Sequence, residues 1–314
     1  MLGNPKKSIV FIIGPTAVGK SDVALHLAQQ MSGEIISCDS MQIYRQINIA
    51  SNKPSAADLK KIKHHCIDII SVDQEFNVAQ FNTMVAEYIT KIHAKGCTPI
   101  VVGGSGMYVQ ILLDGIFEGA PKDDNLRREL KFQAEQYGNE YLYDKLEIVD
   151  PQAAAKIHAN DLKRLIRALE VSLSEQKLFS ELKQKRIGLW GQYDIQIFVL
   201  NRNRAQLYQR INERVDHMIR QGLVDEIKKL KAMKLSLTAQ GAIGIKEILN
   251  YLNEACSLQK SVELMKQNTR RFAKQQLTWF RRDKRFQWID IEDGVAVEEI
   301  VEKIKNLIGR EASS

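Results

Sequence analysis

The stretch that decides the fold is Gly14-Pro15-Thr16-Ala17-Val18-Gly19-Lys20-Ser21, which fits the pattern G-x-x-x-x-G-K-[ST] at every fixed position. The short apolar run SIVFII (8–13) precedes it, and apolar residues at helical spacing follow it from Ser21 onward. In a strand–loop–helix of this kind, backbone N–H groups converge on phosphate oxygens. Lys20 adds a positive charge, and the Ser21 hydroxyl can ligate Mg²⁺. The stretch therefore predicts a phosphate-binding loop; phosphate binding is intrinsic to the motif, whereas a nucleotide such as ATP is not.

Short apolar runs alternate with helical patterns on both sides of this loop. EIIS (34–37), TPIVVGG (98–104) and IQIFVL (195–200) predict strands, and Asn77 to Ile92 predicts an amphipathic helix. Alternation of this kind is typical of a parallel sheet covered by helices on both faces. The sequence therefore predicts an α/β fold with a P-loop NTPase-like parallel sheet core.

The strand signal disappears between residues 116 and 190, where the patterns are helical. We therefore expect a P-loop catalytic core formed by residues 1–115 and 191–314, and an inserted helical domain formed by 116–190. Within the second part of the core, the pattern predicts four helices, a strand at FQWID and a last helix. The four helices are expected near 203–219, 223–234, 242–253 and 258–283.

Composition limits the class of protein. The chain has 314 residues, of which 44% are hydrophobic, and it holds no apolar run long enough to span a membrane. The four cysteines lie far apart without metal-type spacing, so we expect reduced thiols in a cytoplasmic protein. The net charge is +7, and residues 266–285 hold eight lysines and arginines with a single acidic residue. Such a stretch favours a polyanionic partner over a solvated surface, although charge alone leaves both open.

Asp39 is the only acidic residue directly after a core strand. Because the carboxyl ends of parallel strands line the ligand crevice, Asp39 should lie near the phosphate-binding loop. A carboxylate there can accept a proton from a nucleophile, or it can cap a turn or order Mg²⁺. The strand PIVV ends instead in Gly103-Gly104, without the acid that an NTPase places there. These features favour group transfer to an acceptor over hydrolysis.

Several separate motifs resemble the tRNA dimethylallyltransferases, also called tRNA isopentenyltransferases, over nearly the whole chain. They are GPTAVGKS (14–21), CDSMQIYR (38–45), NKP (52–54), VVGGSGMYV (101–109), HANDLKRLIRALE (158–170), LYQRINERVDHMIRQGLVDEI (207–227), AIGIKEI (242–248) and TRRFAKQQLTWFRRD (269–283). The resemblance implies transfer of a dimethylallyl group from dimethylallyl diphosphate to N6 of adenine 37 in tRNA, with Mg²⁺ and release of diphosphate. It also implies a monomeric enzyme whose partner is the tRNA anticodon stem-loop.

The resemblance assigns catalytic roles to matching residues. Asp39 would accept the adenine N6 proton, and Thr16 would hydrogen-bond the oxygen that bridges the diphosphate and the dimethylallyl carbon. Lys20 and Arg214 would neutralise the departing diphosphate, and Ser21 would hold Mg²⁺. Arg214 is chosen by motif alignment, since general physics does not separate it from Arg210.

The resemblance also assigns RNA contacts. The residues implied are Asp39, Ser40, Met41, Gln42, Ser105, Arg127, Lys163, Arg164, Arg167, Lys246, Lys274 and Arg281. The reactive base would be flipped out of its stack, because its amine must reach a buried electrophile. The alternatives remain open here: Met41 can be a core residue, and Lys163, Arg164 and Arg167 can pair with Asp161 or Glu170.

Four parts of the chain depart from the family pattern. Residues 48–52 read Asn-Ile-Ala-Ser-Asn where D-I-G-T-A is usual, Ile245 replaces a tyrosine, Ser105 replaces a threonine, and Gln275 replaces an arginine. The sequence leaves three other functions open: a P-loop small-molecule kinase or ATPase, a catalytically silent RNA-binding module, and a relative that prenylates free AMP.

Overall fold

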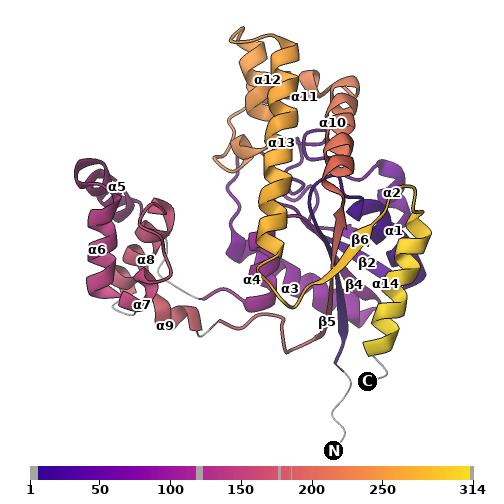
Figure 1. Ribbon diagram of the computed structural model, residues 1–314, viewed down its shortest axis with the longest axis horizontal. Coiled ribbons are helices and arrows are strands. Elements are labelled where there is room, and N and C mark those ends of the chain that lie inside the picture. Colours follow the sequence, from indigo (N-terminus) through magenta and orange to yellow (C-terminus); the bar gives the residue numbers. More distant parts are fainter. Residues whose placement is uncertain (1–5, 118–122, 176–177, 185, 312–314) are drawn as a thin grey trace, which may run out of the picture. The chain divides into compact units, whose positions relative to one another are not determined.

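The computed structural model describes residues 6–117, 123–175, 178–184 and 186–311, and it divides the chain into two compact units (Figure 1). Unit 1 consists of Met1–Leu112 and Trp190–Ser314, and unit 2 consists of Leu113–Leu189.

A parallel six-stranded sheet forms the centre of unit 1, with strand order β3-β2-β4-β1-β5-β6. Its strands are β1 (Ser8–Ile13), β2 (Gly33–Cys38), β3 (His64–His65), β4 (Thr98–Gly103), β5 (Asp194–Arg202) and β6 (Gln287–Ile291). The sheet class predicted from the sequence is therefore confirmed. The two-residue strand β3 was not predicted, because it is too short to show a pattern.

Helices of unit 1 flank this sheet (Figure 1). The unit contains α1 (Lys20–Gln30), α2 (Ala56–Lys61), α3 (Val78–Ala94), α4 (Gly106–Asp114), α10 (Arg204–Arg220), α11 (Leu223–Lys231), the 3-10 helix η1 (Ala239–Gly241), α12 (Ile245–Leu252), α13 (Leu258–Phe280) and α14 (Val297–Glu311). Helices α10 to α13 extend beyond the carboxyl edge of the sheet (Figure 1). α4 runs two residues past the boundary of unit 1.

Both faces of the sheet are buried. Val10 and Ile12 of β1 join a core cluster with residues of α1, α10, α13 and α14. Ile9 and Phe11 alternate with them and so point to the opposite face, where they are also fully buried. Burial on both faces explains why the strands are continuous apolar runs rather than alternating ones.

The strand ends that carry functional residues lie level with one another. Gly103 at the end of β4 pairs in register with Ile13 of β1 on one side and with Cys38 of β2 on the other. The residues that follow these three strands therefore leave the sheet at one edge, side by side. This register brings the phosphate-binding loop, Asp39 and the Gly103-Gly104 turn together.

The regular elements in the described part of unit 2 are all helices. Unit 2 contains α5 (Asp124–Tyr137), α6 (Asn139–Val149), α7 (Pro151–Ala154), α8 (Leu162–Glu175) and α9 (Phe179–Gln184). Leucines such as Leu130, Leu142, Leu146 and Leu165 form its core. Since none of these helices shares the core cluster of the sheet, unit 2 buries its apolar side chains separately.

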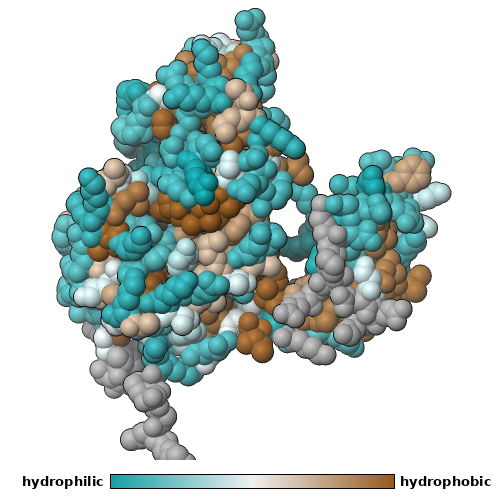
Figure 2. Space-filling model, turned by 180° about the vertical axis from the view of Figure 1, so that it is seen from behind, coloured by the Kyte–Doolittle hydropathy of each residue, from teal (hydrophilic) through white to brown (hydrophobic). Residues whose placement is uncertain are grey.

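Hydrophilic residues cover most of the face shown in Figure 2. No helix in the described part of the chain is long and apolar enough to cross a membrane. All four cysteines are free thiols, as predicted.

Candidate active site

The phosphate-binding loop leaves helix α1 with an open amino end. Gly19 precedes the helix at φ 108°, and no side chain caps the first turn. Gly14 has φ 149°, and a Cβ there would lie 2.6 Å from the carbonyl oxygen of Leu200, so only glycine fits. The uncapped N–H groups and the helix dipole form a site for an anion.

Lys20 folds back over this loop. Its Nζ donates a hydrogen bond to the carbonyl oxygen of Pro15, at 2.8 Å. Burial, together with the charge of Arg214, lowers the pKa of Lys20 to about 7, while Asp39 acts in the opposite direction. An anion bound at the loop would add to the negative charge of Asp39 around this buried amine.

Three arginines from β5 and α10 hold successive residues of the loop. Arg202 Nε donates to the carbonyl oxygen of Val18 at 3.0 Å, and Arg210 Nε donates to that of Ala17 at 2.9 Å. Arg214 differs from both, because its Nη1 donates to the side-chain Oγ1 of Thr16 at 3.0 Å.

Arg214 also differs from Arg210 in burial and position. Burial lowers the pKa of Arg214 to about 10, against the opposing effect of Asp39, so the group remains a cation at neutral pH. Arg210 is exposed. The geometry therefore separates the two arginines that sequence physics left equivalent.

Asp39 follows the last residue of β2, and its Oδ1 accepts the N–H of Met41 at 2.8 Å. This turn fixes the carboxylate while leaving its second oxygen for other partners. The electrostatic effect of Asp39 on both Lys20 and Arg214 places the three charges in one neighbourhood.

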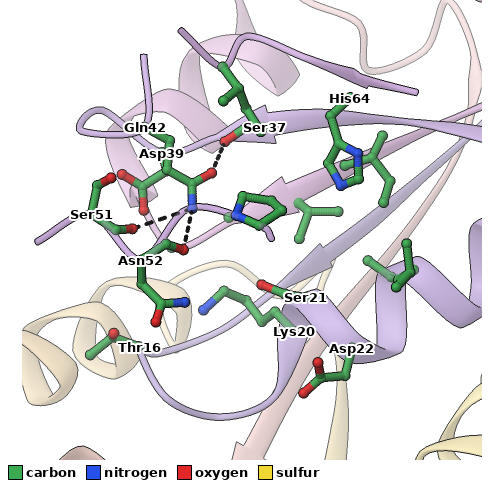
Figure 3. Close-up of a pocket in the computed structure, with 18 of the residues that line it drawn as sticks. Thr16, Lys20, Ser21, Asp22, Ser37, Asp39, Gln42, Ser51, Asn52 and His64 are labelled. Carbon is green, nitrogen blue, oxygen red and sulfur yellow. Dashed lines mark hydrogen bonds between the residues drawn. The ribbon is translucent and has the colours of Figure 1, made fainter. Parts of the chain in front are cut away.

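Two pockets meet at these residues. The loop pocket is lined by Lys20 and Ser21 of the phosphate-binding loop and by His64, among others (Figure 3). The methionine pocket is mainly apolar and is lined by Met41, Met218, Met265, Ile243 and Ala242, among others. Thr16, Asp39, Ser51, Arg214 and Phe272 line both pockets. A hydroxyl, a carboxylate and a guanidinium thus stand where the two pockets join.

A third, basic pocket lies beside the phosphate-binding loop, and we name it the mouth pocket. Its lining residues include Lys20, Ser21, Arg210, Arg214 and Arg220. Arg214 lines all three pockets. Anionic ligands would therefore meet positive charge on approach as well as at the loop.

Gln42 orders the wall of the loop pocket. Its Nε2 donates to the carbonyl oxygens of Ser51 (3.4 Å) and Asn52 (3.2 Å), and its Oε1 accepts from Ser37 at 2.7 Å (Figure 3). Gln42 was predicted to touch RNA, and in the structure its amide is occupied by these three bonds.

Glu226 of α11 fixes the segment just before these residues. Its Oε2 accepts the N–H groups of Asn48 (2.9 Å) and Ile49 (2.8 Å), and its Oε1 accepts that of Ala50 (3.0 Å). Sequence reasoning missed this role, since Glu226 lies far along the chain in the LVDEI part of a longer motif. Phe272, which lines both pockets, was missed as well, although it lies in the quoted motif at 269–283.

Ser40, Met41 and Ser105 all line the methionine pocket. The N–H of Ser40 donates to the hydroxyl oxygen of Ser105 at 3.3 Å, so the β2 and β4 turns are joined there. Met41 is partly buried in this wall. These three residues, predicted as RNA contacts, are brought together by the fold.

Two of the three arginines of unit 2 that were predicted to contact RNA, Arg127 and Arg167, are bound to a buried carboxylate. Glu170 is fully buried and accepts two hydrogen bonds from Arg127, at 2.8 Å each, and one from Arg167 at 2.6 Å. Burial opposes ionisation of Glu170, but these bonds outweigh it and lower its pKa. Lys163 is exposed, and Arg164 is exposed while pairing with Asp161 at 3.3 Å. For Arg164 and Arg167, pairing with Asp161 or Glu170 was the alternative that the sequence left open; the bonds of Arg127 to Glu170 were not predicted.

Some of the cations in the basic stretch 266–285 are also paired with carboxylates of the protein. Lys266 pairs with Asp216 at 2.8 Å, and Arg285 pairs with Asp283 at 2.6 Å. The exposed cations of the stretch are Arg271, Lys274, Arg281, Arg282 and Lys284. Lys246 is exposed on α12, and its neighbour Ile245, where the family has a ring, is buried.

Comparison with known proteins identifies the family of this arrangement. The family model described as IPP transferase matches residues 42–283. The chain belongs to the IPP transferase family. A tRNA dimethylallyltransferase from Halothermothrix orenii is 44% identical over 303 residues, covering 96% of this chain and 92% of the relative. The matched segment of the family model begins after the phosphate-binding loop and Asp39, whereas this relative covers nearly the whole chain.

Solved structures of the IPP transferase family agree. The full-length tRNA isopentenylpyrophosphate transferase from Bacillus halodurans is 38% identical with a TM-score of 0.72, covering 97% of this chain and 96% of that one. A eukaryotic dimethylallyltransferase acting on tRNA is 30% identical with a TM-score of 0.80, covering 97% of this chain and 80% of that one. The P-loop NTPase-like core with a helical insertion is therefore the fold of a prenyltransferase family.

Proposed function

We propose that this chain transfers a dimethylallyl group from dimethylallyl diphosphate to N6 of adenine 37 in tRNA and releases diphosphate. The observation that carries the proposal is the set of side chains shared by two pockets, namely Thr16, Asp39 and Arg214. One pocket contains the anion site of the phosphate-binding loop, and the other is apolar enough for a planar base. A reaction between two substrates needs its chemical groups at such a junction.

The residues at the junction fit the bonds that change. N6 of adenine attacks C1 of the dimethylallyl group, and the bond between C1 and the bridging diphosphate oxygen breaks. The Thr16 hydroxyl donates to that oxygen, and Lys20 and Arg214 stabilise the diphosphate charge. The proton lost from N6 passes to the Asp39 carboxylate. Enclosure by the pocket walls keeps water from the developing allylic cation.

The members of the IPP transferase family are prenyltransferases, which generally use a divalent metal ion, and we propose Mg²⁺. Ser21 is the second residue of α1 and lines both the loop pocket and the mouth pocket. In the residues searched, no three His, Cys, Asp or Glu side chains gather to form a metal cage. A hydroxyl supplemented by diphosphate oxygens and water is the ligand set that Mg²⁺ accepts, whereas softer metals prefer nitrogen or sulfur. When bound, the ion would neutralise charge on the diphosphate.

We propose that RNA binds to exposed cations on both units. On α13 and the turn that follows, these include Lys274 and Arg281; on α8 of unit 2, they include Lys163 and Arg164. Such cations bind the phosphate backbone with a strong dependence on salt. The helical insertion would thus grip the anticodon stem-loop while the core carries out the reaction.

The test incubates the protein with unmodified tRNA, dimethylallyl diphosphate and Mg²⁺, followed by nucleoside mass spectrometry. The expected product is adenosine that carries one dimethylallyl group in place of hydrogen, at position 37 only. A parallel incubation with ATP measures phosphate release, which a small-molecule kinase or ATPase would produce. A third replaces tRNA with AMP. Unchanged RNA in the first incubation would contradict the proposal.

A further inference from the structure

The side chain of Gln276 on α13 joins two turns of the active site. Its Oε1 accepts the N–H of Thr16 at 2.9 Å, and its Nε2 donates to the carbonyl oxygen of Gly104, also at 2.9 Å. The residue is only 6% exposed. One amide therefore connects the phosphate-binding loop to the turn that follows β4.

The turn after β4 leaves room for this amide. A Cβ added to Gly104 would lie 2.2 Å from Gln276 Nε2, so any other residue there would displace the side chain. At Gly103 the obstacle is different, since a Cβ would lie 2.1 Å from the carbonyl oxygen of Cys38. The two adjacent glycines thus serve two separate close approaches, and the second serves Gln276.

The bond from Gln276 changes what Thr16 can offer a ligand. In a phosphate-binding loop, the backbone N–H groups normally point at the anion. The N–H of Thr16 is instead used by Gln276, and its Oγ1 accepts from Arg214 at 3.0 Å. The hydroxyl hydrogen of Thr16 remains as its donor. Held from both sides, the hydroxyl has a fixed direction.

We infer that Gln276 is a positioning residue that aims the Thr16 hydroxyl at the bridging oxygen of the donor, an inference that rests on the proposed function. An amide suits this place because it accepts from one turn and donates to the other without adding charge beside a diphosphate. Glu cannot donate when ionised, and Lys or Arg cannot accept. Asn is shorter by one methylene and cannot span the same gap.

If Gln276 only stabilised the fold, its loss would lower the melting temperature or the affinity for the donor, and the Thr16 hydroxyl would keep its full effect on the rate. If Gln276 positions Thr16, its loss lowers kcat, and the contribution of the Thr16 hydroxyl to the rate is lost as well. A double-mutant cycle between the two residues therefore separates the two roles.

The experiment measures single-turnover dimethylallyl transfer to tRNA for wild type, Thr16→Val, Gln276→Met and the double variant. We expect Thr16→Val to lower the rate about 100-fold and Gln276→Met about 30-fold, in the range seen when one transition-state donor is lost or misdirected. The double variant should be no slower than Thr16→Val alone. KM for the diphosphate should change less than about threefold, because the rest of the loop is intact.

Gln275→Met is the matched control, since Gln275 is the same residue type on the same helix but is exposed. It should retain the wild-type rate. The inference is wrong if Gln276→Met loses no more activity than Gln275→Met, or if the two active-site substitutions multiply in the double variant. Absence of transfer by wild type would instead overturn the proposed function.

A second variant covers the case in which Gln276→Met does not fold. Gln276→Glu keeps the acceptor for the Thr16 N–H and loses only the bond to Gly104. With this variant we expect a higher KM for the diphosphate, because of the added negative charge, and a rate that still falls about 100-fold on Thr16→Val. A Glu variant in which Thr16→Val has no effect would overturn the inference.

Discussion

The arginines around the phosphate-binding loop and those of unit 2 differ in what holds them. Arg127 and Arg167 share the buried carboxylate of Glu170, so each is held in an ion pair within the protein. Arg210 and Arg214 bind a carbonyl and a hydroxyl, and no ion pair among the described residues ties either to a carboxylate. Dipoles orient these cations without cancelling their charge. An arginine that is paired with a carboxylate thus has a structural role, whereas an arginine held by dipoles can bind an anionic ligand.

The largest effect should come from Asp39, the carboxylate at the pocket junction. We expect Asp39→Asn to lower the transfer rate about 1,000-fold, because the substituted amide cannot accept the N6 proton. Single-turnover assays measure the rate, and filter binding should give an unchanged affinity for tRNA. A variant with wild-type activity would remove Asp39 as the base.

The next largest effect should come from the loss of Arg214, and it should exceed the effect of losing Arg210. Arg214→Gln should lower kcat about 100-fold, because it removes a desolvated cation at the leaving diphosphate. Arg210→Gln should cost less than about tenfold, since the exposed guanidinium acts through solvent. Steady-state kinetics of both variants provides the comparison. Equal losses would show that burial does not decide which arginine acts.

In unit 2, the expected effect is on stability rather than chemistry. Glu170→Gln should lower the stability of this unit by about 3 kcal/mol, as expected when a buried ion pair loses one partner. Hydrogen exchange of amides in α5 and α8 measures it, since all three tryptophans lie in unit 1. Glu147→Gln, at an exposed position of α6, is the control and should leave exchange unchanged.

Exposed cations should affect RNA binding modestly. Substituting Lys274 and Arg281 together by Ala should weaken tRNA binding about tenfold and reduce the slope of log affinity against log salt by about 2. Filter binding at several salt concentrations measures both quantities. A large loss with an unchanged slope would mean that these residues act by folding rather than by contacting phosphates.

The smallest signal is a proton taken up at the loop. Because the pKa of Lys20 is about 7 in the free protein, its amine is mostly neutral at pH 8. A bound diphosphate favours the ammonium form, so binding at pH 8 should take up close to one proton and at pH 6 almost none. Titration calorimetry in buffers of different ionisation enthalpy measures this uptake. Lys20→Met corrects for protons taken up by the ligand itself.

The same depressed pKa has a consequence for stability. Unfolding returns Lys20 to its ordinary pKa of 10.5, so the unfolded chain binds more protons between pH 7 and 10.5. The contribution of Lys20 to stability should therefore rise with pH across this window. In Lys20→Met this part of the pH dependence of unfolding should disappear.

The sequence predicted the parts of the site that are local in the chain. A motif of eight residues predicted the loop, and the rule for parallel strands predicted that Asp39 would stand beside it. The bonds of Gln276 to Thr16 and of Glu226 to Asn48 join residues far apart in the chain. Such contacts depend on how the helices pack, and neither residue has a pattern of its own.

The boundaries of the helices also show what the sequence pattern does not predict. The predicted helix at 242–253 starts at Ile245, because the preceding Gly244 has φ 103° and cannot continue the helix. The helices α2 and α4 were missed, since α2 buries no residue and α4 directly follows a glycine-rich turn. Periodicity identifies elements with one long buried face and misses those without one.

The three bonds that Glu226 accepts from residues 48–50 bear on how this chain can diverge from its relatives. Main-chain N–H groups are the same for every residue except proline, so the carboxylate holds the segment regardless of its side chains. Natural variation can therefore change the residue types at 48–50 while the path of the backbone is preserved. Two kinds of change would break these bonds: a proline among those positions, or loss of the acid that accepts them.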